Sequence, residues 1–76
     1  MTDKIKLEIA IIESGLTKHE VAEKLGLSDM GFYKKINNIT EFKASEIVKL
    51  KEILKLEAIE PIFFANKVEL NSTKRD

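Results

Sequence analysis

Apolar residues recur at helical spacing in the first sixteen residues of the chain. Ile5, Ile9, Ile12 and Leu16 follow one another at intervals of four, three and four residues, which places them on one face of a helix with 3.6 residues per turn. Glycine tolerates the left-handed backbone that commonly ends a helix. We therefore predict a first helix that has these four residues on its apolar face and ends at Gly15.

A second, short helix is predicted to begin at Thr17. Glu20 follows three positions later, which is the spacing of a capping box, where the two side chains bond reciprocally to the first helical turn. Gly26 stands where the chain must turn, and Leu27 is expected to close that turn. The residues expected on the inner side of this helix are Val21, Ala22 and Leu25.

A third helix is predicted over residues 29–36. Ser28 precedes it and is a good N-cap residue. Phe32 and Ile36 are four residues apart, so both side chains are expected to point inward on one helix face. The residues expected to end this helix are Asn37 and Asn38.

A fourth helix is predicted over residues 44–54, although Lys43 is a poor residue for its N-cap. A weaker helical turn is expected over residues 57–60, before Pro61, which lacks an amide donor and disfavours helix at the preceding residue. The inner residues predicted for the fourth helix are Ile47, Leu50, Ile53 and Leu54.

After Pro61 the spacing of apolar residues changes to every second residue, which predicts one β-strand. A lone strand needs a partner edge, and the simplest partner is the same strand of a second copy. We expect residues 1–60 to form the helical domain, residues 61–70 a dimerisation strand and residues 71–76 a polar tail. The residues predicted at the dimer interface are Ile62, Phe63, Phe64, Val68 and Leu70.

Length and composition limit the possible functions. Seventy-six residues make one domain, which is too small for both a core and a deep catalytic cleft. Cysteine is absent and His19 is the only histidine, so we expect no disulfide and no metal site. No phosphate loop or nucleophile with a base is found, which argues against an enzyme, and no cofactor or small-molecule ligand is expected. We expect a cytoplasmic protein without a membrane partner, because no signal peptide or long apolar run is found.

For binding of nucleic acid, the distribution of charge along the chain matters more than the net charge. Thirteen basic and thirteen acidic residues give a net charge of zero, whereas neutralisation of phosphates drives most non-specific binding of nucleic acids. The middle of the chain is richer in lysine than in glutamate, which allows a local basic face. The lysines there are Lys34, Lys35, Lys43, Lys49, Lys51 and Lys55, and the glutamates are Glu41, Glu46 and Glu52.

The two short helices joined by a tight turn are the most specific signal, because Gly26 permits the turn and small Ala22 lets the helices cross closely. Together with residues 32–38 and 47–54, the segment 17–28 makes the chain resemble the lambda-repressor-like, or Cro/repressor, helix-turn-helix family over about residues 3–56. It is also similar in style to small regulators of temperate phages. The resemblance implies an all-α domain of four to five helices that binds a double-stranded DNA operator as a homodimer, as a transcriptional repressor or Cro-like regulator in a bacterial or phage-infected cell.

The resemblance also implies roles for particular residues. The third helix would enter the major groove, and the N-terminus of the second would rest on a phosphate. The base-reading candidates are Asp29, Met30, Tyr33 and Lys34. Of these, Lys34 could donate to guanine or a phosphate, and Met30 could contact a thymine methyl group. The candidates for contact with the DNA backbone are Thr17, Lys18, Ser28, Asn37, Asn38 and Lys43.

Two residues depart from the family's pattern. Lys35 stands where an apolar residue is more usual, with Ile36 taking that place one residue later, and Asp29 puts a negative charge where DNA would approach. Gly31 within a helix costs about 1 kcal/mol relative to alanine, which favours close packing against the second helix or close approach to DNA. We expect His19 to be a solvated side chain.

A second hypothesis is a protein-interaction module, such as an antirepressor or co-regulator. Met30 and Tyr33 could complete the core or a partner interface, because exposed apolar side chains are common on small domains. Phe63 and Phe64 could likewise lie in the core or at an interface, and we favour the dimer interface. The zero net charge and Asp29 are the features that favour this second hypothesis.

Overall fold

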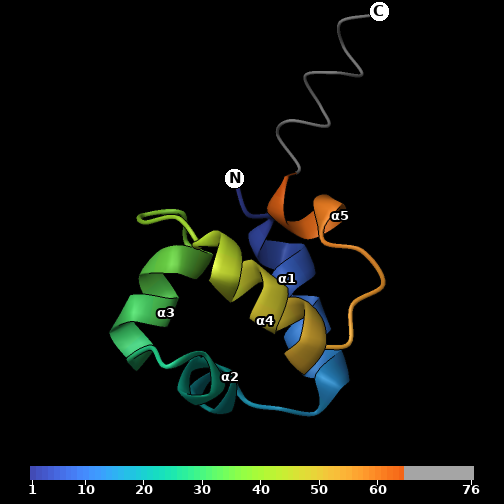
Figure 1. The fold of residues 1–76 in the computed structure, drawn as a ribbon. Helices are drawn as coiled ribbons and strands as arrows, with labels where there is room; N and C mark the ends of the chain where they lie inside the picture. The colour runs from blue at the N-terminus through green and yellow to red at the C-terminus, as the bar shows by residue number, and fades with distance from the viewer. Residues whose placement is uncertain (65–76) are drawn as a thin grey trace, which may run out of the picture.

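The computed structural model describes residues 1–64, which form five helices (Figure 1). No strand occurs in this part of the chain, so the predicted all-α fold is confirmed for it. No helix among these residues is long and apolar enough to cross a lipid bilayer. The helices are α1 (Lys4–Ser14), α2 (Lys18–Leu25), α3 (Asp29–Ile36), α4 (Ala44–Ile53) and α5 (Glu60–Phe63).

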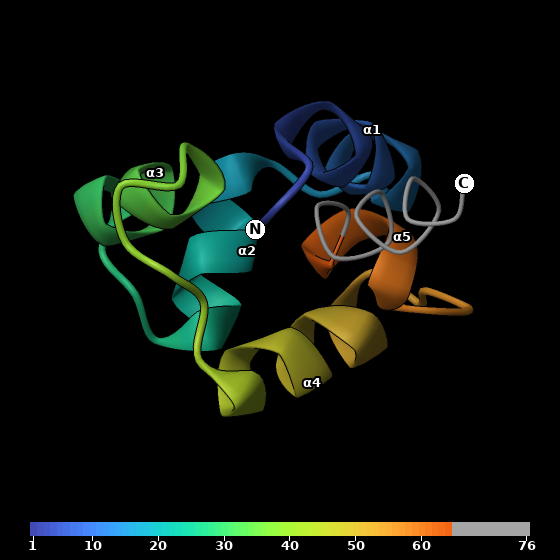
Figure 2. The same ribbon diagram turned by 90° about the horizontal axis from the view of Figure 1, so that it is seen from above.

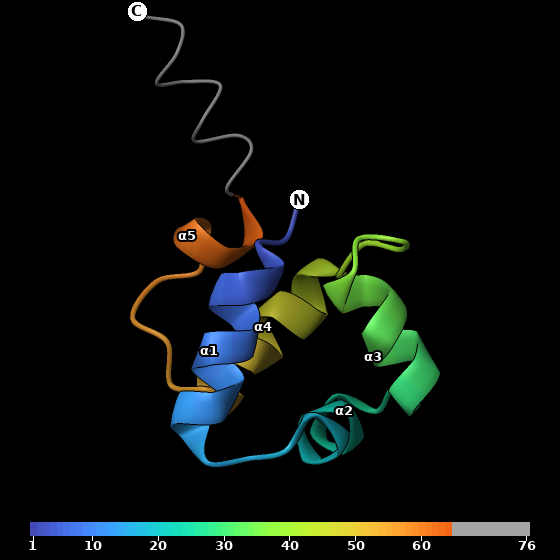
Figure 3. The same ribbon diagram turned by 180° about the vertical axis from the view of Figure 1, so that it is seen from behind.

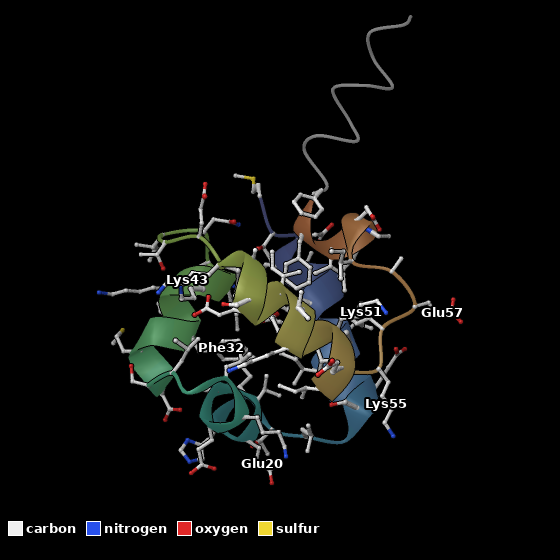
Figure 4. The ribbon with its side chains drawn as sticks, in the orientation of Figure 1. Glu20, Phe32, Lys43, Lys51, Lys55 and Glu57 are labelled. Carbon is white, nitrogen blue, oxygen red and sulfur yellow. The ribbon has the colours of Figure 1, made fainter. Side chains whose placement is uncertain are left out.

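The helices surround one core. α2 packs against α3 and α4, and α5 packs against α1. Seen from above, α3 and α5 lie on opposite sides of the molecule (Figure 2). Phe32 points into the space between α2, α3 and α4 (Figure 4). Its ring meets Phe42 edge-on at a centroid distance of 6.1 Å, and Phe42 meets Phe63 at 5.6 Å. These edge-to-face contacts connect the third helix to the last one.

The buried face of α1 differs from the predicted one. Asp3 caps the helix by accepting the N–H of Lys6, and Gly15 ends it in the left-handed region, as predicted. The face that enters the core, however, consists of Leu7, Ala10 and Ile11. The predicted inner residues Ile5, Ile9 and Ile12 are exposed and Leu16 is half-buried. Both faces repeat at helical spacing, so periodicity could not choose between them.

The turn between α2 and α3 is built as predicted. Thr17 Oγ1 accepts the N–H of Glu20, and Glu20 Oε1 accepts the N–H of Thr17, which completes the capping box. Gly26 has a φ of 76°, and the N–H of Leu27 donates to the carbonyl of Ala22 at 2.9 Å. This is the hydrogen bond that closes a Schellman motif. The predicted inner residues of both helices are buried: Val21, Ala22, Leu25, Phe32 and Ile36.

α4 begins without a capping side chain at Lys43, as predicted, and it buries an unexpected charge. Of its predicted inner residues, Leu50 and Leu54 are buried, whereas Ile47 and Ile53 are half-buried. Glu46 is also buried, and its Oε1 accepts the N–H of Lys43 at 2.8 Å. The carboxylate of Glu46 therefore supplies part of the cap that Lys43 cannot provide.

The end of the described chain is helical where a strand was predicted. Pro61 lies in the first turn of α5, where a missing N–H costs nothing. The helical turn predicted for residues 57–60 therefore begins only at Glu60, and the prediction of a strand is wrong at its start. Ile62 and Phe63 are buried in the core and Phe64 is half-buried.

The N-terminus holds α5 in place. The N–H of Asp3 donates to the carbonyl of Ile62 at 2.6 Å. Because Ile62 and Phe63 are core residues, the prediction that they form a dimer interface is wrong for these two positions. The predicted interface residues Val68 and Leu70 lie outside the described residues.

Candidate nucleic-acid interface

α3 presents a continuous outer face that carries all four base-reading candidates. Met30 and Tyr33 are 61% and 56% exposed, and the other two, Asp29 and Lys34, are also exposed. Spacings of three and four residues bring these side chains together on one side of the helix. Phe32 and Ile36, on the other side, are buried and fix the helix against the core. The predicted candidates are therefore held side by side on a rigid element.

The N-terminus of α3 is held by Ser28 and Gly31. Ser28 Oγ accepts the N–H of Gly31 at 3.0 Å, so this hydroxyl is used as a cap. A Cβ atom at Gly31 would lie 3.2 Å from the same oxygen, which is tighter than ordinary van der Waals contact. No atom of α2 lies within 4 Å of that position, so the predicted packing against the second helix is wrong, and the glycine is close to its own cap instead. The expected close approach to DNA stays a prediction.

His19 and Asp29 form a pair across the turn, which the sequence did not indicate. His19 Nδ1 lies 2.8 Å from Asp29 Oδ1, and both side chains are largely exposed. The hydrogen bond with Asp29, followed by the charge of the same carboxylate, raises the pKa of His19 above its usual 6.5. Protonated His19 therefore offsets the negative charge that Asp29 places on the outer face of α3.

Lys18, at the first position of α2, forms an ion pair with a residue of α1. Its Nζ donates to Glu8 Oε2 at 2.7 Å. This hydrogen bond lowers the pKa of the Glu8 carboxyl group. Lys18 remains exposed, so a phosphate could compete with Glu8 for the ammonium group. Such a contact would be weaker than one from an unpaired lysine, because it must replace an existing ion pair.

A groove of about 380 Å³ runs beside this face, between α1 and the α2–α3 pair. Lys4 and Glu8 line it on the α1 side, and Asp29, Tyr33 and Asn37 line it on the α3 side. It separates the outer face of α3 from α1. The His19–Asp29 and Lys18–Glu8 pairs both lie along its wall.

Lys35 does not contribute to a basic surface, contrary to the charge pattern of the sequence. Its Nζ lies 3.2 Å from Glu46 Oε1, and the two side chains are only 12% and 11% exposed. The same ammonium donates to the carbonyl of Glu41 and lies 6.0 Å from the centre of the Phe42 ring. The half-buried lysine is therefore accommodated by an ion pair between α3 and α4.

Two candidates for contact with the DNA backbone, Asn37 and Asn38, also have structural roles. Asn38 Oδ1 accepts the N–H of Thr2, and its Nδ2 donates to the carbonyl of Thr2, both at 3.0 Å. Asn37 Nδ2 donates to the carbonyl of Tyr33 at the end of α3. These amides fasten the loop after α3, and each NH2 group keeps one further N–H, so the predicted contact with phosphates stays a prediction. Lys43, at the start of α4, is exposed.

Thr17 and Ser28, the other two candidates, have hydroxyl groups that serve as N-caps. Both residues are exposed at helix N-termini, where free N–H groups and the helix dipole favour an anion.

Within residues 1–64, no cluster of three or more His, Cys, Asp or Glu side chains could hold a metal ion.

Comparisons with models of known protein families, with curated proteins and with solved structures found no match to this chain. The function of the α3 surface is therefore inferred from its own residues.

Proposed function

We propose that the chain is a helix-turn-helix protein that binds double-stranded DNA as a homodimer and regulates transcription. In this proposal α2 and α3 are the two helices of the motif, as in the lambda-repressor-like family that the sequence resembles, and α3 lies in the major groove. The observation that carries the proposal is the outer face of α3. Its exposed residues at positions 29, 30, 33 and 34 project from a helix that Phe32 and Ile36 anchor in the core.

The side chains on this face can contact and hydrogen-bond to the base edges exposed in the major groove of DNA. Lys34 can donate to guanine O6 and N7, and Met30 can contact the methyl group of thymine. Tyr33 combines an apolar ring with a hydroxyl group that can donate or accept. Asp29 is paired with His19, so a protonated His19 would offset the charge of its carboxylate where the phosphates approach. Lys18 and Lys43 flank the face and would hold the helix in place on the DNA backbone.

The proposal is tested by selecting duplexes from a randomised library with the full chain and measuring affinity by fluorescence anisotropy. We expect a pseudo-palindromic sequence, because a dimer with twofold symmetry reads two half-sites. Lys34→Ala should weaken binding by about tenfold, as expected from about 1–3 kcal/mol for one good base contact. The matched control is Lys51→Ala, on α4 and away from α3 (Figure 4), which should bind as the unchanged protein does. No enriched motif, or equal losses in the two variants, would contradict the proposal.

A second candidate function is a protein-interaction module that uses the same face of α3. Two observations favour it. The net charge is zero, and the ammonium group of Lys35 is held in a largely buried ion pair with Glu46 instead of being available at the surface. Exposed Met30 and Tyr33 suit a protein partner as well as a base edge. The two functions are separated by salt, because binding to DNA through lysines weakens steeply as salt rises, whereas an apolar protein interface changes little.

A further inference from the structure

α1 carries a row of large apolar side chains that no other described helix covers. Ile5, Ile9 and Ile12 are 69%, 48% and 75% exposed, although spacings of four and three residues place them on a single helix face. We call these three residues the α1 isoleucine row. Figure 3, which views the molecule from behind, shows α1 at the front with α4 behind it. The row therefore faces away from the core.

Such a row differs from ordinary surface hydrophobicity. Single exposed apolar residues are common on soluble proteins, whereas contiguous apolar patches mark interaction sites. Elsewhere in residues 1–64, exposed Met1, Ile39 and Val48 lie in three different segments, and Met30 and Tyr33 belong to the face of α3. The α1 isoleucine row contributes nothing to the core, which uses Leu7, Ala10 and Ile11 from the same helix. A helix with two apolar faces fits a core on one side and a partner on the other.

We propose that the α1 isoleucine row is the contact between two copies of this chain, with the two α1 helices packed antiparallel. The charges beside the row are what identify the partner. Lys6 and Glu13 are seven residues apart, which is about two helical turns, so both lie on the same side of the row. In an antiparallel pair centred near Ile9, Lys6 of each copy comes close to Glu13 of the other. Twofold symmetry produces this contact twice.

A parallel pair would not make this contact, because one flank of each helix then faces the opposite flank of its partner, and Lys6 and Glu13 do not meet. Like charges at facing positions disfavour association and opposite charges favour it. On the other side of the row, the carboxylate of Glu8 is already bonded to Lys18 at 2.7 Å, so two Glu8 side chains near the symmetry axis would not meet as unpaired anions. The charge pattern therefore suits an antiparallel second copy.

This contact leaves the proposed DNA surface uncovered. None of the three isoleucines is among the residues proposed to contact DNA, and the groove lined by Lys4 and Glu8 lies between α1 and the α3 side chains. Self-association through α1 requires no DNA. If this contact fails, the proposed function loses its dimer interface but the proposed role of α3 stands, and if α3 fails to bind DNA the contact between the two copies stands.

A contact made by one face of a single helix buries less area than most stable complexes. We therefore expect a dissociation constant in the micromolar range and a population of dimers that rises with concentration. Sedimentation velocity of the full chain without DNA, from about 1 to about 500 μM, should show the average mass rising from one chain toward two. A mass of one chain at every concentration would overturn the proposal.

Ile12→Lys tests the row itself. Ile12 is the most exposed member of the row, so the substitution should leave the helical circular dichroism and the urea midpoint unchanged. It should raise the dissociation constant of the dimer at least tenfold, because a charge would have to be buried in an apolar contact. Val48→Lys, at an exposed apolar position on α4, is the matched control and should leave dimerisation unchanged. Equal effects of the two substitutions would overturn the assignment of the interface.

A charge exchange tests the direction of the helices. Lys6→Glu should weaken the dimer, because two glutamates then face each other, and adding Glu13→Lys should restore it. The restored variant keeps the composition of the protein and changes only the order of the charges. In a parallel pair positions 6 and 13 do not meet, so adding Glu13→Lys would not restore what Lys6→Glu removed. Failure of the double variant to recover dimerisation would therefore overturn the antiparallel arrangement.

Discussion

Glu46→Ala is expected to lower the free energy of unfolding by about 2–3 kcal/mol. The substitution removes the acceptor for the N–H of Lys43 at 2.8 Å, and loss of such a cap costs about 1 kcal/mol. It also removes the counter-ion of the Lys35 ammonium, whose side chain is 12% exposed, and leaves that group with the carbonyl of Glu41 and the Phe42 ring. The loss of one partner by a buried charged group costs about 1–3 kcal/mol. The cost lies toward the lower end, because a lysine stem can bend to bring its ammonium to water.

The effect should depend on pH in a specific direction. Burial would raise the pKa of Glu46, but hydrogen bonds from the Lys43 N–H and from Lys35 outweigh burial, so the pKa lies below the usual 4.5. A carboxyl group with a lowered pKa in the folded state stabilises the fold above its unfolded pKa. This contribution is lost as pH falls through the folded pKa. The difference between the original protein and Glu46→Ala should therefore be full at pH 7 and shrink below about pH 4.

Urea unfolding followed by circular dichroism at pH 7 and pH 3 measures both effects. Glu52→Ala is the matched control, because Glu52 lies on the same helix and is exposed. It should change stability by less than about 0.5 kcal/mol. The reasoning is refuted if the two variants are equally stable at pH 7, or if the loss caused by Glu46→Ala is the same at both pH values.

Two further predictions concern the turn between α2 and α3. Gly26→Ala should lower the free energy of unfolding by about 1 kcal/mol in urea titrations, because φ is 76° there and a Cβ atom is strained in that region; an unchanged midpoint would contradict this. In NMR titrations the pKa of His19 should lie above 6.5, and Asp29→Asn should lower it toward that value, because Asp29 causes most of the rise. The stabilisation from the His19–Asp29 pair should be present below about pH 6.5 and disappear as pH rises through the folded pKa of His19. The same His19 pKa in the unchanged protein and in Asp29→Asn would exclude this pair as the cause.

The sequence predicted the parts of the fold that depend on neighbouring residues. The capping box at Thr17 and Glu20, the turn at Gly26 and the cap at Ser28 are each determined within a few positions of the chain, and all three are present. The outer face of α3 follows from the same local information, because burial of Phe32 and Ile36 leaves the remaining positions outside.

The predictions that failed depend on contacts between distant residues. The buried face of α1 could not be chosen from spacing, because the residues at 7, 10 and 11 and those at 5, 9 and 12 both fit a helix. Pro61 was interpreted as a helix breaker, although the first turn of a helix accepts proline. What fixes α5 there is packing against α1 and the hydrogen bond from Asp3, which is distant in sequence.

The charged pairs at the candidate site could not be predicted for the same reason. Lys35 and Glu46 are on different helices, and His19 and Asp29 lie ten residues apart on either side of the turn. The departure of Lys35 from the apolar pattern of the family that the sequence resembles was the signal that an unusual contact exists there. Nothing in the sequence indicated that Glu46 was its partner.

The dependence of DNA affinity on salt tests the central claim most directly. If Lys18, Lys34 and Lys43 of both copies contact phosphates or bases, the logarithm of the binding constant for the selected duplex should fall with the logarithm of salt concentration with a slope of about −5. This corresponds to a loss of about a thousandfold between roughly 50 and 200 mM salt. A slope near zero, or the same weak binding to every duplex, would contradict the account and favour a protein partner for α3.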